Sequence, residues 1–82
     1  MKLTSKTILN ATRKRKAEET DFAVLDNLGI NSAGILQSYH NLLFLSLKYN
    51  QLQSVEFLRG CSNLWILELQ QNPVSYTCLY RR

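Results

Sequence analysis

The sequence predicts an α/β fold: a short solenoid with a small parallel sheet on its concave face, an N-terminal helical cap and an incomplete C-terminal cap. Three observations lead to this prediction. A leucine-rich segment at 42–52 recurs at 64–74, apolar residues recur about every three positions between the two copies, and residues 5–19 lack proline and glycine. Repeated units of this kind stack because one unit alone cannot bury its apolar face.

The composition is that of an ordinary globular chain. Its 82 residues are 45% hydrophobic and 20% charged, which argues against disorder or a coiled-coil rod and allows one marginally stable domain. No segment approaches the ~18 apolar residues that cross a bilayer, and polar residues interrupt the N-terminus where a signal peptide needs an apolar run. We therefore expect a cytoplasmic protein without membrane contact.

Residues 1–19 are predicted to form a basic helical cap over the first strand. Residues 5–19 would be the helix, with Ile8 and Leu9 as its best apolar contacts. Residues 1–16 hold six Lys or Arg and no acidic residue, whereas residues 17–82 hold four basic and six acidic residues, a net charge of −2. The basic character therefore belongs to this leader, and a whole-surface nucleic-acid footprint is weak.

Four consecutive cations in the leader have three interpretations. They form a nuclear import signal, an arm for phosphate groups, or the solvated face of a helix. The helix face would be supported by pairs four residues apart, such as Lys14 with Glu18. Another such pair is Arg15 with Glu19. No aromatic residue is interleaved with the run to stack on bases, so direct RNA binding is disfavoured. The run consists of Arg13, Lys14, Arg15 and Lys16.

The repeat occupies residues 20–82 in about 2.5 copies. Both clear copies read L-x-x-L-x-L-x-x-N-x-(L/V). Alternate strand residues share a face, so Leu45 and Leu47 enter the core, and the asparagine of each copy bonds backbone groups where the chain leaves the strand. Phe22 and Val24 reproduce the spacing of Leu45 and Leu47, which places one extra residue near Leu28 or Gly29. The predicted asparagine ladder is Asn27, Asn50 and Asn72.

Each strand is followed by a return segment with apolar residues about every three positions. This period suits a 3₁₀ or α-helical segment whose inward face covers the strand residues. The predicted inward residues are Ile30, Ala33, Leu36, Tyr39 and Leu42 in one segment, and Leu52, Val55, Leu58, Cys61 and Leu64 in the next.

Residues 22–82 resemble the leucine-rich repeats of the protein phosphatase 1 regulatory subunit type, a class that includes the spliceosomal snRNP A-prime protein. In that class a Tyr-Arg pair follows the asparagine-proline pair at a fixed distance and opens a C-terminal cap. Here Asn72 and Pro73 are followed by Tyr80 and Arg81. The sequence ends at Arg82, where the cap of that class continues. The resemblance therefore implies a last repeat that lacks its usual cover.

The first nine residues, MKLTSKTIL, are similar to the start of the cilia- and flagella-associated protein 410 family of basal-body leucine-rich proteins. This similarity implies a structural role in a cilium or basal body. It also implies partners such as NIMA-related kinases or axonemal proteins.

The strand residues that do not enter the core are predicted to line the concave face and to bind a protein partner. Exposed aromatic side chains on a rigid sheet are typical anchors of such interfaces. For Trp65 the alternative is that its ring folds over the strand edge and completes the core. The open C-terminal edge of the sheet is a second expected contact. The predicted partner-binding residues are Phe44, Ser46, Lys48, Tyr49, Trp65, Ile66, Glu68 and Gln70.

Catalysis finds little support in the sequence. His40 is the only histidine and has no Ser or Cys partner at a recognisable spacing, and Cys61 falls at an inward position. Without a C-x-x-C pair, we expect no metal site, and we expect no cofactor. The leading hypothesis is a non-catalytic interaction adaptor or structural subunit of a ciliary, basal-body or cytoskeletal assembly. The alternative is a nuclear ribonucleoprotein assembly subunit of the snRNP A-prime type.

Overall fold

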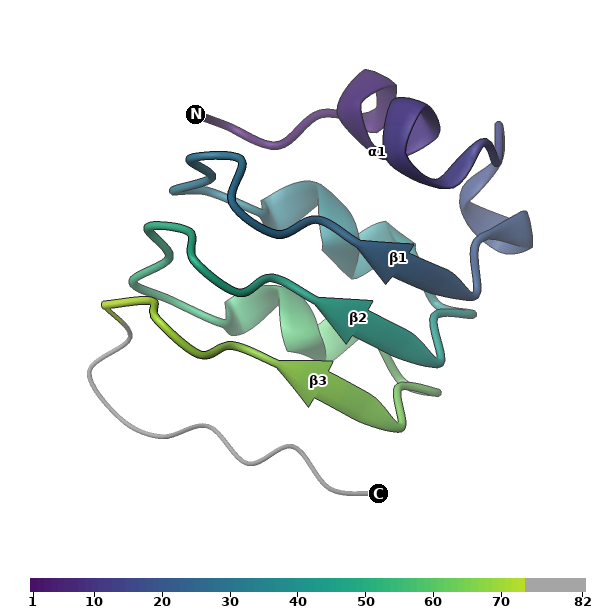
Figure 1. Ribbon diagram of the computed structural model, residues 1–82. Coiled ribbons are helices and arrows are strands. Elements are labelled where there is room, and N and C mark those ends of the chain that lie inside the picture. The colour runs from purple at the N-terminus through teal and green to yellow at the C-terminus, as the bar shows by residue number, and fades with distance from the viewer. Residues whose placement is uncertain (74–82) are drawn as a thin grey trace.

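Within residues 1–73, three short parallel strands form a sheet in the order β1-β2-β3 (Figure 1). They are β1 (Phe22–Val24), β2 (Phe44–Ser46) and β3 (Ile66–Glu68). The structure is a computed structural model and describes residues 1–73. Together with the one α-helix of the described residues, the sheet makes a small α/β domain, as the sequence predicts. The predicted start of the C-terminal cap lies outside the described residues.

The strands follow one another at equal intervals along the chain. Phe22 pairs with Phe44, and Phe44 pairs with Ile66. Between the strands the chain returns through two 3₁₀ helices, η2 (Gly34–Ser38) and η3 (Glu56–Gly60), which pack against each other behind the sheet (Figure 1). The helices cover one side of the sheet, and we call the opposite side, which faces the viewer in Figure 1, the open face.

The core lies between the sheet and the 3₁₀ helices. Leu45 and Leu47 point into it and are fully buried, as predicted. All five predicted inward residues of the first return segment are also buried. The second segment differs at one place, because Phe57 is buried in the core while Leu58 is only partly buried against it.

The N-terminal helix is shorter than predicted. Helix α1 (Ser5–Thr12) ends where Arg13 takes a left-handed backbone conformation with φ 64°. The Thr12 hydroxyl donates to the Ile8 carbonyl and accepts from the Lys14 amide, and such local bonds compete with helix continuation. A longer helix would also place the like charges at 13 and 16 on one face.

The rest of the leader forms only the short 3₁₀ helix η1 (Ala17–Glu19). Helix α1 packs against β1 through the buried Ile8, whereas Leu9 is exposed, so only one of the two predicted apolar contacts forms. Within the described residues no helix is both long and apolar enough to cross a membrane.

The first strand is aligned differently from the prediction. Phe22 pairs with Phe44 and not with Leu45, so the chain has no extra residue near Leu28 or Gly29. As a result, Ala23 and Leu25 enter the core, and Phe22 and Val24 lie exposed on the open face. The prediction failed because apolar residues occupy both faces of this strand, and the spacing alone does not distinguish them.

Candidate interaction surface

Asn50 fixes the turn that follows β2 to the turn that follows β1. Its side-chain oxygen accepts from the amides of Leu28 and Ile30 at 2.9 and 3.1 Å. Its nitrogen donates to the carbonyls of Leu25 and Leu47, both at 2.9 Å. The asparagine is buried, and its bonds to Ile30, Leu25 and Leu47 satisfy buried backbone groups.

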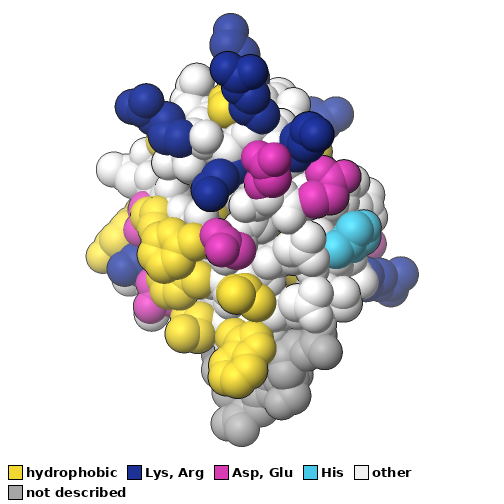
Figure 2. Space-filling model, turned by 90° about the vertical axis from the view of Figure 1, so that its right-hand side faces the viewer, with side chains coloured by type: hydrophobic (Ala, Val, Ile, Leu, Met, Phe, Trp, Pro, Cys, Tyr) yellow, Lys and Arg dark blue, Asp and Glu magenta, His cyan; other side chains and the backbone are white. Residues whose placement is uncertain are grey.

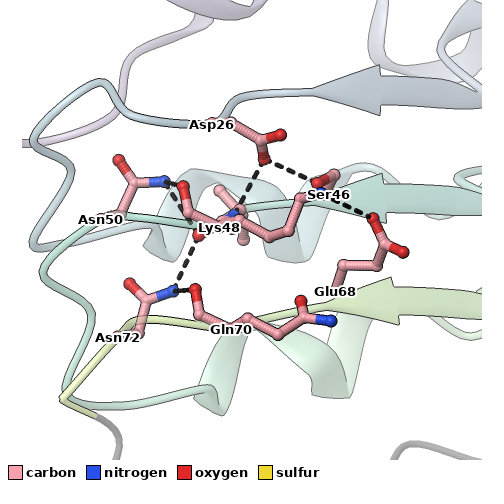
Figure 3. A network of polar contacts seen from close by, with 8 residues as sticks. Asp26, Ser46, Lys48, Asn50, Glu68, Gln70 and Asn72 are labelled. Carbon is pink, nitrogen blue, oxygen red and sulfur yellow. Dashed lines mark hydrogen bonds and ion pairs between the residues drawn. The ribbon is translucent and has the colours of Figure 1, made fainter.

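Asn72 repeats this arrangement one unit later (Figure 3). Its oxygen accepts from the Leu52 amide at 3.0 Å, and its nitrogen donates to the carbonyls of Leu47 and Leu69 at 2.8 and 3.0 Å. These two side chains hold the three strand ends in register. Side-chain hydrogen bonds therefore hold the backbone that carries the open face.

Asn27 does not belong to the ladder. In the register set by Phe22 and Phe44, its place corresponds to Tyr49 and Gln71, and all three residues have left-handed backbones with φ 56°, 62° and 64°. Leu28 occupies the ladder position of the first unit instead. An asparagine tolerates a positive φ better than most residues, so Asn27 serves the turn through its backbone.

The open face carries a continuous apolar row across all three strands. The row consists of Phe22, Phe44 and Ile66, which are paired in register. The two phenyl rings stack with their centroids 4.5 Å apart and their planes 10° from parallel. Phe22 is 58% exposed and Ile66 is 51% exposed, so the row is open to solvent at both ends.

Two further apolar residues lie beside the row, on the side where the strands begin. Leu43 directly precedes Phe44, and Trp65 directly precedes Ile66. Trp65 is 75% exposed, so it does not complete the core in this structure. Its amide donates to the Leu43 carbonyl at 2.9 Å, which places the two residues side by side.

Polar groups border the row on the opposite side, where the strands end (Figure 3). The Asp26 carboxylate accepts from the Ser46 hydroxyl at 2.6 Å and from the Lys48 amide at 2.9 Å. The Lys48 ammonium lies 3.8 Å from the carboxylate of Glu68. Ser46 is only 1% exposed, so it supports Asp26 and offers almost no surface to a partner.

Tyr49 and Gln70 complete the set of predicted contact residues. Both are exposed, and the Tyr49 amide donates to the Gln70 carbonyl at 3.0 Å. A tyrosine with a positive φ is uncommon, because its side chain is crowded in that conformation. The turn therefore presents a large aromatic ring beside the polar border at a cost in backbone strain.

Apolar and basic residues gather on different parts of the surface. Figure 2 shows hydrophobic side chains concentrated on one side of the molecule, below a group of Lys and Arg side chains at the end that carries α1. All four residues of the basic run are exposed and lie beyond the helix. Within residues 1–73 the ion pair that forms joins Lys48 to Glu68, and the predicted pairs with Glu18 and Glu19 do not form.

The remaining reactive side chains serve the backbone. His40 Nδ1 lies 2.7 Å from the Gly60 carbonyl oxygen, and the Cys61 thiol donates to the Leu36 carbonyl at 3.3 Å. Burial raises the pKa of Cys61 from its ordinary value of 9.0 to about 11, so the thiol is protonated at neutral pH. No group of three potential metal ligands occurs within residues 1–73.

A scan of protein-family models, a search of curated proteins and a search of solved structures each found no match to this chain. Function is therefore inferred from the surface of the molecule itself.

Sequence reasoning missed three residues of the open face. The sequence pattern predicts Phe22 and Val24 in the core and assigns no role to Asp26, whereas the structure places all three at the open face. The spacing between the two clear copies identifies all three when it is applied to the first unit, because Phe22 then matches Phe44 and Asp26 matches Lys48.

Proposed function

We propose that this protein is a non-catalytic leucine-rich-repeat adaptor and that the open face of its sheet binds another protein. The supporting observation is the exposed row of Phe22, Phe44 and Ile66, which crosses all three strands. Aromatic side chains on a rigid backbone lose little conformational entropy on binding, and they are common hot spots of protein interfaces.

We further propose that the three strand units are the coils of a short leucine-rich solenoid. The equal spacing of the strands along the chain and the equivalent bonds of Asn50 and Asn72 support this. In this arrangement the open face is the concave face. Units of this kind need cover at both ends, and within residues 1–73 β3 pairs only with β2. The free edge of β3 is the second proposed contact.

The proposed biological setting is a ciliary, basal-body or cytoskeletal assembly. The similarity of the first nine residues to a basal-body family supports it. The alternative is a nuclear ribonucleoprotein assembly subunit, for which the exposed basic run at 13–16 would serve as an import signal. The location of the tagged protein, at the basal body or in the nucleus, decides between the two settings.

The test of the adaptor function is a double substitution, Phe44→Ser with Ile66→Ser. Both side chains point away from the core, so the fold should persist while partner capture by proximity labelling falls at least tenfold. Leu9→Ser is the matched control, because it removes an exposed apolar side chain from α1 instead of the sheet. Circular dichroism checks that all variants are folded. An unchanged set of captured proteins would remove the open face from consideration as the binding surface.

A further inference from the structure

The apolar row has the spacing of a helix surface. Neighbouring strands lie about 4.8 Å apart, so Phe22, Phe44 and Ile66 repeat at roughly that interval. Successive turns of an α-helix repeat every 5.4 Å or so, whereas same-face residues of an extended strand repeat every ~6.7 Å. A helix that crosses the three strands therefore matches the row more closely than an extended peptide does.

The charged groups around the row are mainly acidic. Asp21 is exposed on the side of the row where the strands begin. Its backbone carbonyl accepts from the Leu43 amide at 2.8 Å. Among residues 1–73, Asp26 and Glu68 lie on the side where the strands end, and the Lys48 ammonium lies beside Glu68. These three carboxylates and one ammonium of the described residues carry a net charge of −2.

The net charge of the two borders is negative, whereas the net charge of the rest of the chain is positive. The whole chain carries a net charge of +4, and the leader contributes most of its cations. Figure 2 shows these Lys and Arg side chains gathered at the α1 end, away from the main hydrophobic group. The partner that complements the open face consequently combines an apolar stripe with positive charge on both of its flanks.

We infer that the open face binds an amphipathic α-helix of a partner protein, with leucine-like side chains on the apolar row and Lys or Arg beside Asp21 and Glu68. This inference rests on the proposed adaptor function and specifies the chemistry of the partner. The helix lies across the strands, and its basic flanks meet the acidic borders.

The test uses three synthetic peptides of equal length that contain no tryptophan. One has an apolar stripe at positions i, i+4 and i+7 with Lys flanks, the second has the same stripe with Glu flanks, and the third is the Lys peptide with two internal prolines that prevent a helix. The protein has one tryptophan, Trp65, which is exposed beside the row. Its fluorescence emission shifts to the blue when a peptide covers it, which yields the Kd.

The Lys peptide should bind at least tenfold more tightly than the Glu peptide. Non-specific attraction predicts the reverse order, because the protein as a whole is positive. Asp21→Asn with Glu68→Gln should reduce this preference below threefold. Glu18→Gln with Glu56→Gln removes the same charge from η1 and η3 and should leave the preference unchanged.

The outcomes separate this inference from the adaptor function. Equal binding of the Lys and Glu peptides would contradict the inference that the partner helix has basic flanks. A preference that survives the Asp21 and Glu68 substitutions would contradict it as well. Equal binding of the proline peptide overturns the helix. If no peptide binds while partner capture in cells still depends on Phe44 and Ile66, the inference is wrong and the adaptor function stands. If capture does not depend on them, the adaptor function itself fails.

Discussion

Asn50 and Asn27 contribute to their turns in different ways, one through its side chain and the other through its backbone. Asn50 is buried and bonds the amides of Leu28 and Ile30 through its side chain. Asn27 is exposed and contributes a left-handed backbone with φ 56°. The difference follows from the strand register, which places position 50 under the turn and position 27 at its tip.

Asn50→Ala should therefore lower the free energy of unfolding by about 1–3 kcal/mol, because buried backbone amides and carbonyls lose their partners. Asn31→Ala is the control, since Asn31 is exposed and its side chain makes none of these bonds. Urea denaturation followed by circular dichroism measures both. Equal losses for the two variants would show that the Asn50 bonds do not stabilise the turn.

Cys61 makes the stability depend on pH in the alkaline range. Its pKa is about 11 in the folded chain and near 9.0 when exposed, so between these values the folded state holds a proton that the unfolded state has released. The free energy of unfolding should fall as the pH rises from 9 towards 11. Below pH 9 both states hold the proton and the effect vanishes.

The measurement is a series of urea denaturations at pH 8, 9 and 10 on the parent protein and on Cys61→Ala. The difference between the two cancels the contributions of all other groups, including Tyr39, whose pKa burial also raises. The advantage of the parent protein should shrink with pH. A constant difference would mean that Cys61 titrates alike in both states.

At the scale of the elements, the two 3₁₀ helices η2 and η3 approach each other closely. The Gly60 carbonyl oxygen lies 2.7 Å from His40 Nδ1, and Asn63 donates to the His40 carbonyl at 3.0 Å. A Cβ at Gly60 would lie 1.8 Å from the carbonyl oxygen of Gln37, at the end of η2. The backbones at Gly60 and Gln37 are in contact, and only glycine fits because it has no Cβ.

Gly60→Ala should consequently destabilise the protein by about 1–3 kcal/mol or more, since η3 has to move away from η2. Gly34→Ala is a matched control in the equivalent helix, where an added Cβ meets nothing within 4 Å. Its stability should stay within about 0.5 kcal/mol of the parent. Thermal unfolding of both variants tests this, and a tolerated Gly60→Ala would contradict the close stacking of the helices.

At the scale of the whole molecule, charge and apolar surface are separated. The leader holds six cations and no acid among its first sixteen residues, and the open face holds the apolar row with its acidic borders. The two regions can therefore be altered independently. Under the proposed function, the open face bears on partner binding and the basic run bears on cellular location.

Replacing residues 13–16 by glutamine should leave the free energy of unfolding within about 0.5 kcal/mol, because the four side chains are exposed and lie outside α1. Under the ciliary proposal, fluorescence microscopy should find the tagged variant where the parent protein is, outside the nucleus. Nuclear accumulation of the parent that is lost in the variant would favour the ribonucleoprotein alternative.

The sequence by itself determined the α/β fold and most of the core. The spacing of Leu45 and Leu47 placed both in the core, and the three-residue period predicted all five buried residues of the first return segment. It also placed Phe44 and Ile66 on the open face. These features follow from local periodicity, because alternation along a strand and recurrence along a helix are properties of short segments.

Tertiary structure decided the alignment of the first strand and the borders of the open face. Strand pairing brought Phe22 next to Phe44, although apolar residues at neighbouring positions made either face of the strand possible from the sequence. Asp26 joined the surface through bonds to Ser46 and Lys48, which belong to the next unit. Contacts over such distances depend on how the units stack, and the local sequence pattern does not contain that information.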